Sequence, residues 1–283
     1  MKKILILKNP GQKKRLIDAI ALRWTQGGHR VITHYGTKDL PEADIVILHV
    51  DTTYLPAQYL WELRRYPVVV NRGAVNISKS EFSRNIVTEK DDYAGAVIIK
   101  TKTNYGGLPD AWYRNPSLMG KLRLRLRIFG QRNHSWNDRS ELDPFNYPIL
   151  KSKKEVPEGV WKNQNLMVQR FLPEREGELF FIRYYVFFGD QGWARRFGSK
   201  KPIVKFRTRV TDEEHVSVPN ELVEVRNRLS LDYGRIDYVQ HDGKAMVFDV
   251  NRALGGVTNN LDKFEVELNS LALGINRFVE QCN

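Results

Sequence analysis

Residues 234–256, GRIDYVQHDGKAMVFDVNRALGG, contain two β-prone runs that are joined by the turn residues Asp242 and Gly243. The length of the turn decides where the polar side chains point, because successive side chains alternate between the two faces of a strand. A two-residue turn would send Asp237 and Asp249 to opposite faces of the hairpin. A three-residue turn that is closed by a bulge at Gly243 keeps both carboxylates on one face, and we expect this turn.

The expected hairpin has one polar face and one apolar face. The polar face contains Arg235, Asp237, Asp249 and Asn251. The apolar face, which we expect to be core, contains Ile236, Tyr238, Met246, Phe248 and Val250. Carboxylate and amide oxygens at this density suit Mg²⁺ or Mn²⁺, which take further ligands from water and from substrate phosphates. A charged strand face that is only solvated is the alternative.

The motifs GRID (234–237), DVN (249–251) and GG (255–256) resemble the last motif of the ATP-grasp superfamily, which includes D-alanine–D-alanine ligase and glutathione synthetase. The resemblance implies three ligands for two Mg²⁺ ions on the phosphates of ATP: Asp237, Asp249 and Asn251. It also implies that Arg235 contacts an acyl-phosphate intermediate. The family usually has a glutamate where this chain has an aspartate at 249.

The composition is that of a globular protein. The chain has 283 residues, of which 41% are hydrophobic, so two or three lobes are expected. The single cysteine, Cys282, excludes a disulfide framework and a thiolate metal site. No apolar run reaches membrane-spanning length, and the N-terminal Met-Lys-Lys leads into a strand instead of a signal peptide, so we expect a cytoplasmic protein.

The net charge of +12 indicates an anionic partner such as a nucleotide, an acidic substrate or nucleic acid. The densest basic run is KLRLRLRIFGQR at 121–132, where basic and apolar residues alternate. The alternation predicts a strand with one basic and one apolar face. Nucleic acid is the less favoured partner, because no aromatic stacking residues are interleaved with the basic ones.

Short apolar runs alternate with helical patterns from Lys3 to Val70, which predicts an α/β fold with a parallel, doubly wound sheet. Val31–Thr33 and Ile45–Leu48 are expected as buried strands of this sheet. No GxGxxG motif follows the first strand, so a dinucleotide fingerprint is absent. Apolar residues at helical spacing over 261–279 predict a closing helix. With the family resemblance, we expect a Rossmann-like lobe at 1–75, a lid subdomain at 76–165 and a C-terminal subdomain at 166–283.

The run AVIIK (96–100) followed by TKTNYGG (101–107) predicts a strand that delivers a lysine to a loop of small residues. Backbone N–H groups of such a loop can contact phosphate oxygens, and glycine permits the close approach. The pattern resembles the ATP-grasp strand lysine and phosphate lid, which implies that Lys100, Asn104, Gly106 and Gly107 bind ATP phosphates. Lys79 ends a turn that resembles a further family motif, although Ser78 replaces the aspartate of that motif. The resemblance implies that Lys79 reaches a nucleotide phosphate.

Residues 165–174, NLMVQRFLPE, resemble the hinge strand that recognises the adenine edge in the same family. The resemblance places four residues at the adenine: Gln169, Arg170, Phe171 and Leu172. In the family a carboxylate beyond the strand takes the ribose hydroxyls; Glu176 or Glu178 could serve here, and we expect Glu176. In the aromatic run 180–188, Arg183 resembles a family arginine that faces the transferred phosphate, so we expect it to act beside Arg235.

The resemblance therefore implies an ATP-dependent carboxylate–amine (or thiol) ligase that works through an acyl phosphate and releases ADP and phosphate. The basic composition favours an acidic small-molecule or peptide substrate. Two alternatives stay open at this point. One is a phosphotransferase on the same scaffold. The other is a basic nucleic-acid or polyanion binder whose ATP site is not active, since a fold does not fix a function.

Overall fold

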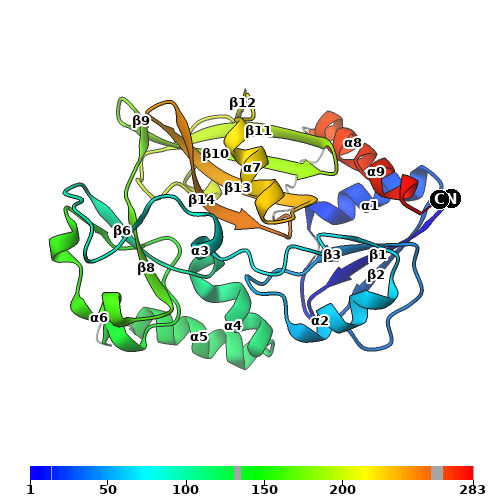
Figure 1. The fold of residues 1–283 in the computed structure, drawn as a ribbon, viewed down its shortest axis with the longest axis horizontal. Coiled ribbons are helices and arrows are strands. Elements are labelled where there is room, and N and C mark those ends of the chain that lie inside the picture. The colour runs from blue at the N-terminus through cyan, green and yellow to red at the C-terminus, as the bar shows by residue number, and fades with distance from the viewer. Residues whose placement is uncertain (14, 131–134, 256–263, 283) are drawn as a thin grey trace.

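The computed structural model describes residues 1–13, 15–130, 135–255 and 264–282, with the side chains of residues 127 and 129 also left out. In these residues the strands form three sheets that follow one another along the chain (Figure 1). Gly256 of the last motif and residues 261–263 of the expected closing helix lie outside the described part.

The first sheet is parallel, which confirms the α/β prediction. Its strands, in the order β2-β1-β3-β4, are β1 (Lys3–Lys8), β2 (Arg30–Tyr35), β3 (Ile45–His49) and β4 (Val68–Val70). Two helices cover opposite faces: α1 (Leu16–Gln26) and α2 (Ala57–Glu62). Ile4 and Ile6 pack on the α1 side, whereas Leu5 and Leu7 pack on the α2 side. β2 is an edge strand and is only partly buried, so the expectation of a buried strand at 31–33 is wrong.

The second sheet is antiparallel and has the order β5-β8-β6-β7. Its strands are β5 (Ile86–Val87), β6 (Val97–Thr101), β7 (Ile149–Leu150) and β8 (Leu166–Arg170). The helices of this region are α3 (Lys79–Phe82), α4 (Leu108–Arg114), α5 (Leu118–Gly130) and α6 (Glu158–Lys162).

Helix α5 contradicts the strand that was expected at 121–132. The alternation of leucine and arginine satisfies the period of a strand, but both residues are also strong helix formers. Only Leu124 of the described side chains in this run is fully buried, at 8% exposure, while Leu122 and Leu126 are exposed. Among its described side chains, helix α5 therefore packs on the rest of the protein mainly through Leu124. A strand with alternating faces would instead have buried all three leucines.

The third sheet has the order β12-β11-β10-β13-β14, with β9 paired to β10. Its strands are β9 (Glu174–Glu176), β10 (Leu179–Phe188), β11 (Gln191–Ser199), β12 (Glu214–Val216), β13 (Tyr233–His241) and β14 (Lys244–Asn251). α7 (Asn220–Arg228) covers one face, while α1, α8 (Glu265–Leu273) and α9 (Asn276–Glu280) cover the other (Figure 1).

Buried polar side chains join the third sheet to the first. Arg252, directly after β14, is 1% exposed and donates hydrogen bonds to the carbonyl oxygens of Val50, Thr52 and Ala74. These bonds place the end of β14 beside the carboxyl end of β3. The division of the chain into domains at 75 and 165 stays a prediction, and β8, expected at the start of the last domain, pairs with the second sheet.

The β13–β14 hairpin corrects the expected turn. His241 pairs with Lys244, so the loop has two residues, Asp242 and Gly243, both with positive φ. The register shifts between Asp237 and Tyr238, where β14 contains one extra residue. Asp237 consequently pairs with Asp249. The carboxylates share a face as expected, but a bulge inside β14 produces this arrangement instead of a longer turn.

None of the helices in the described part of the chain is long and apolar enough to cross a membrane.

Candidate active site

A cavity lies between the second sheet and the third sheet. Charged side chains from both sheets and from the adjoining segments point into it: Lys79, Lys100, Arg170, Lys205, Asp237 and Asp249. Its apolar wall includes Ile98, Tyr147, Phe171, Leu172, Val239 and Phe248. β6, β8, β13 and β14 thus contribute to one site, although they come from distant parts of the sequence.

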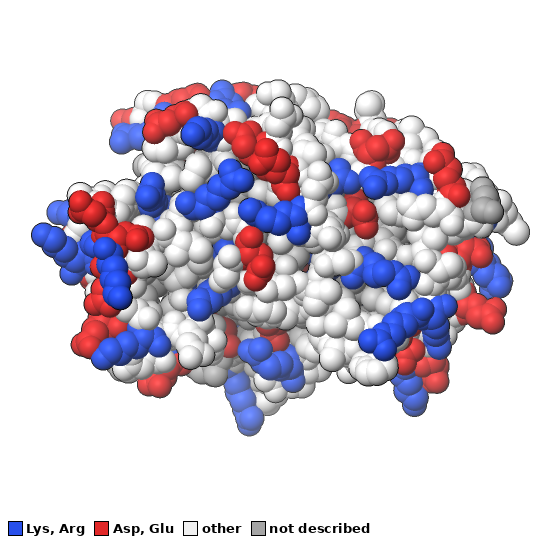
Figure 2. Space-filling model, in the orientation of Figure 1, with Lys and Arg blue, Asp and Glu red and all other residues white. Residues whose placement is uncertain are grey.

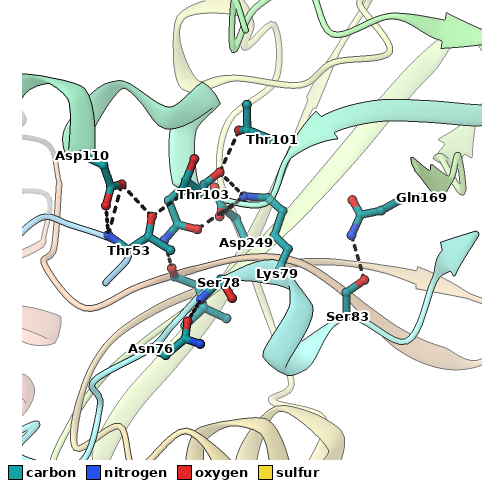
Figure 3. A network of polar contacts seen from close by, with 12 residues as sticks. Thr53, Asn76, Ser78, Lys79, Ser83, Thr101, Thr103, Asp110, Gln169 and Asp249 are labelled. Carbon is teal, nitrogen blue, oxygen red and sulfur yellow. Dashed lines mark hydrogen bonds and ion pairs between the residues drawn. The ribbon is translucent and has the colours of Figure 1, made fainter. Parts of the chain in front are cut away.

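Lys79 occupies the first turn of α3 and is 2% exposed. Its Nζ donates a hydrogen bond of 2.9 Å to the carbonyl oxygen of Thr103 and lies 3.2 Å from Oδ1 of Asp249 (Figure 3). A third contact of Lys79 Nζ, of 3.4 Å, is with Oδ1 of Asn104. The lysine therefore joins the loop after β6 to a carboxylate of β14.

Lys100 and Lys205 line the same cavity without a carboxylate partner among the described residues. Nζ of Lys100 lies 4.7 Å from the ring centroid of Phe248, and both ammonium groups lie within 6 Å of the Tyr147 ring, at 5.8 and 5.9 Å. Burial, together with nearby Lys79, lowers the pKa of Lys100 to about 7. Burial also lowers the pKa of Lys205. Both ammonium groups are therefore poorly solvated, and the charges of Asp237 and Asp249 in the same cavity offset only part of this cost.

Asp237 and Asp249 face each other across β13 and β14. Asp237 accepts a hydrogen bond of 2.6 Å from Nε of Arg235, and burial raises the pKa of this carboxyl, which Arg235 partly offsets. Oδ1 of Asp249 is buried and accepts no hydrogen bond from the described residues, although Lys79 lies within ion-pair distance. A buried carboxylate oxygen without a hydrogen-bond donor is a suitable ligand for a hard cation.

Asp237 and Asp249 suit a divalent cation that takes its other ligands from water and from a bound phosphate. Among the described residues, no group of three or more His, Cys, Asp and Glu side chains could hold a metal ion alone. Two opposed carboxylates would leave most positions to water and substrate oxygens, as Mg²⁺ prefers. Asn251, the third predicted ligand, pairs with Arg235 in the hairpin but does not line the cavity.

Three of the four residues that were predicted to bind adenine line the cavity, and the fourth does not. Arg170, Phe171 and Leu172 line the cavity. The amide of Phe171 donates to the carbonyl oxygen of Ala96, whereas the amide of Leu172 has no hydrogen-bond partner among the described residues. Gln169 is fully buried behind the strand and donates to Ser83 Oγ at 2.7 Å, so its side chain does not reach the cavity (Figure 3).

Contacts with other parts of the protein fix the conformation of the loop after β6. Asn104 is buried, and its amide N–H donates to Oγ1 of Thr53 at 2.9 Å. Gly106 has a φ of +68°, and a Cβ at this position would lie 2.1 Å from the carbonyl oxygen of Leu142. Glycine is thus required here by the backbone of Leu142, not by a phosphate as the sequence suggested. Neither these two residues nor Gly107 is among the residues that line the cavity.

Three further predicted residues are not among those that line the cavity: Arg183, Glu176 and Arg235, although Arg235 donates a hydrogen bond to the lining residue Asp237. Arg183 pairs in register with the core residue Tyr238, on the opposite face of the sheet from Asp237, and makes a bidentate ion pair with Glu174 at 2.8–2.9 Å. The structure therefore contradicts its role beside Arg235. Glu176 is half exposed and ion-paired with Arg196, outside the cavity lining.

Sequence reasoning missed three residues of the site. Lys205 lies in an irregular segment without a recognisable motif, so no pattern in the sequence singled it out. Tyr147 lies between α5 and β7, in a stretch of the sequence without a sustained hydrophobic period. Phe248 was assigned to the core, since the bulge that turns it toward the cavity has no sequence signature.

A comparison with solved structures shows that the chain has the ATP-grasp fold. PsnB, an ATP-grasp ligase in complex with a phosphomimetic variant of its minimal precursor, Mg and ADP, is 13% identical at a TM-score of 0.55, covering 99% of this chain and 98% of that chain. The macrocyclase MdnC of Microcystis aeruginosa MRC, bound with its precursor peptide MdnA, is 10% identical at 0.54, covering 97% and 99%.

D-alanine–D-alanine ligase from Bacillus anthracis, complexed with ATP, is 14% identical at a TM-score of 0.50, covering 100% of this chain and 97% of that chain. No protein-family model matches the sequence, and no curated protein matches it. The resemblance that the motifs indicated is therefore confirmed at the level of the fold.

Proposed function

We propose that the protein is an ATP-dependent ligase of the ATP-grasp type. ATP phosphorylates a carboxylate, and an amine or thiol then attacks the acyl phosphate, which releases phosphate; ADP is the other product. One observation supports this most strongly: Lys100 and Lys205 are buried in a cavity that also contains Asp237 and Asp249, yet neither forms an ion pair with a described carboxylate. Buried charges without partners are costly, so the cavity is built to receive a polyanion.

The cations of the site would hold the phosphates of ATP. Lys79, Lys100 and Lys205 come from α3, β6 and the segment before β12, so they approach a bound triphosphate from different directions. Asp237, Asp249 and Asn251 would hold one or two Mg²⁺ ions, which supply charge neutralisation on the phosphates when bound. Positioning and charge neutralisation are the main requirements of phosphoryl transfer.

Arg235 would stabilise the charge that develops on the acyl carbon's oxygen. Its guanidinium is oriented by Asp237 and lies 4.4 Å from the ring centroid of Tyr184, so its position is fixed before substrate binds. The backbone amide of Leu172, which makes no hydrogen bond to a described residue, and the apolar wall beside it suit an adenine edge and ring. Glu176 and the loop of Asn104, Gly106 and Gly107 stay in their predicted roles only if nucleotide binding moves them toward the cavity.

The acceptor is a small molecule or a peptide. PsnB and MdnC were solved with precursor peptides, which supports a peptide for this chain as well. The net charge of +12 favours an acidic one. Anionic peptides should therefore stimulate ADP release more than neutral peptides of the same length, and equal stimulation would contradict this part of the proposal.

A phosphotransferase is the second candidate, and the position of Arg183 favours it. A ligase must stabilise a tetrahedral intermediate, and the structure leaves Arg235 without the second arginine that was expected for this task. Product analysis separates the two reactions. A ligase requires both a carboxylate and a nucleophile for ADP release, whereas a phosphotransferase requires only one acceptor.

Asp237→Asn tests the proposed metal and phosphate site. We expect the rate of Mg²⁺-dependent ADP formation to fall by about 10²-fold or more, because one of two carboxylates at the metal is lost. Asp242→Asn is the matched control, since its side chain in the turn of the same hairpin is 90% exposed. ADP formation is measured over amino acids, peptides and small acids. An unchanged rate in Asp237→Asn would contradict the proposed site.

A further inference from the structure

Helix α5 exposes apolar side chains along one side. Leu118, Met119, Leu122 and Leu126 are 87%, 59%, 51% and 63% exposed. The i, i+4, i+8 spacing of the three leucines places them in one stripe, and Met119 borders it. Leu124 faces the protein and anchors the helix. Exposed apolar surface of this extent on one element indicates an interaction surface.

A polar groove runs beside this stripe, between α4, α5 and residues 139–142. Its volume is about 380 Å³, and its lining includes Arg114, Ser117, Met119, Arg123 and Glu141. The Glu141 side chain is only 2% exposed and lies 3.6 Å from Nη2 of Arg114, which remains 62% exposed. Met119 lines the groove and borders the apolar stripe, so the two features form one continuous surface.

We propose that the α4–α5 groove docks an acidic, leucine-bearing segment of a polypeptide. Leucines of the partner would cover the stripe of Leu118, Leu122 and Leu126, while a carboxylate would enter the groove between Arg114 and Arg123. The charge of the surface is complementary to such a partner, because Lys121 and Arg125 add two further cations on α5. A Leu-rich helix face with flanking charges is a common mode of peptide recognition.

Two other classes of partner fit the surface less well. A membrane surface could cover the exposed leucines but could not fill a groove that is bounded by a second helix. Nucleic acid would use the arginines but leave the leucines uncovered, since its affinity comes from phosphate contacts and aromatic stacking. None of the groove residues lines the cavity between the sheets, so docking does not depend on the proposed ATP chemistry.

The test uses a fluorescein-labelled synthetic helix of about 14 residues, with leucine on one face and glutamate on the other. Its dissociation constant is measured by fluorescence anisotropy with the full-length protein. We expect Leu122→Ser and Arg123→Glu each to weaken binding by about tenfold or more. Leu273→Ser and Arg277→Glu, which change exposed residues of α8 and α9, are the matched controls and should not weaken it.

The same peptide with lysine in place of glutamate should bind at least about tenfold more weakly than the glutamate form. Binding should persist in Asp237→Asn, and basal ATP turnover should be unchanged in Leu122→Ser, so failure here is distinct from failure of the proposed ligase. The proposal is overturned if the glutamate peptide does not bind, or if polyglutamate binds equally well. It is also overturned if phosphatidylserine vesicles or an oligonucleotide bind more tightly and lose binding in the same variants.

Discussion

The charge state of Lys100 is sensitive to pH near neutrality. In the free protein its pKa is lowered to about 7 by burial and by Lys79, so it is mostly neutral near pH 8. A bound triphosphate would favour the charged ammonium and raise this pKa again. We therefore predict that ATP binding takes up close to one proton at about pH 8 and almost none at about pH 6. Calorimetry in buffers of different ionisation enthalpy measures the uptake.

Lys100→Arg is the matched control for this proton uptake. A guanidinium remains charged throughout this pH range, so the variant should bind ATP without the additional proton. The protonation of ATP itself is common to both proteins and cancels in the comparison. Equal uptake by the wild-type protein and the variant would show that Lys100 is already charged before ATP binds.

Arg183 gives a second prediction, which concerns stability instead of chemistry. Arg183→Met would leave Glu174, whose side chain is 9% exposed, without its bidentate partner. We expect the free energy of unfolding to fall by roughly 2–4 kcal/mol, because the remaining carboxylate is buried, while kcat for ADP release changes less than about threefold. Urea unfolding and steady-state kinetics measure the two effects. The double variant with Glu174→Gln should recover much of the stability.

A large loss of kcat in Arg183→Met without a loss of stability would restore the role that the sequence suggested for this arginine.

The sequence could not show on which face of the third sheet Arg183 lies, because β10 has aromatic residues on both of its faces and no alternation of polar and apolar residues. Asp237 and Asp249 were predictable, since conspicuous motifs surround them. Lys205 was not, because its place beside them depends on the path of a segment without regular structure.

The bulge in β14 is the feature of the hairpin that arranges the site. It allows a two-residue turn and still pairs Asp237 with Asp249, and it turns Phe248 toward Lys100. Deleting Phe248 would remove the bulge, but the remaining residues could pair regularly and keep the two carboxylates opposite each other. We predict that the deletion raises the KM for ATP by about tenfold through loss of the ring, with kcat within about threefold.

Phe248→Ala is the comparison for this deletion, because it removes the ring and keeps the bulge. Similar KM and kcat values in the two variants would show that the ring, and not the bend of the strand, contributes to ATP binding. Loss of all turnover in the deletion alone would show instead that the bulge itself sets the positions of the carboxylates. The turn and the bulge are coupled, so a sequence argument that considered the turn alone placed the bulge wrongly.

At the level of elements, regular patterns were predicted well where burial enforces them. β1, β3 and β4 of the first sheet lie in the core, and their unbroken apolar runs show it, whereas the edge strand β2 is only partly buried. Helix α5 was missed because most of its described side chains are exposed, so no core contact imposes a period on its sequence. The same exposure makes it the proposed docking surface.

The molecule has an excess of basic residues. On the face that Figure 2 shows, these residues do not form a single patch but are interspersed with acidic ones. The net charge of +12 should then act at long range, by attracting anions to the protein, while the buried lysines determine how long ATP stays bound. Long-range attraction is screened by salt much more strongly than contacts inside a cavity.

We therefore predict that raising NaCl from about 50 to about 500 mM slows the association of a fluorescent ATP analogue by about tenfold and changes its dissociation rate less than about twofold. Stopped-flow fluorescence measures both rates. Lys100→Met should show the opposite pattern, with faster dissociation and an unchanged salt dependence of association, because it removes a contact but only one of many charges. If salt accelerates dissociation instead, the phosphates are bound at an exposed surface, and the polyanion-binding alternative gains support over the ligase.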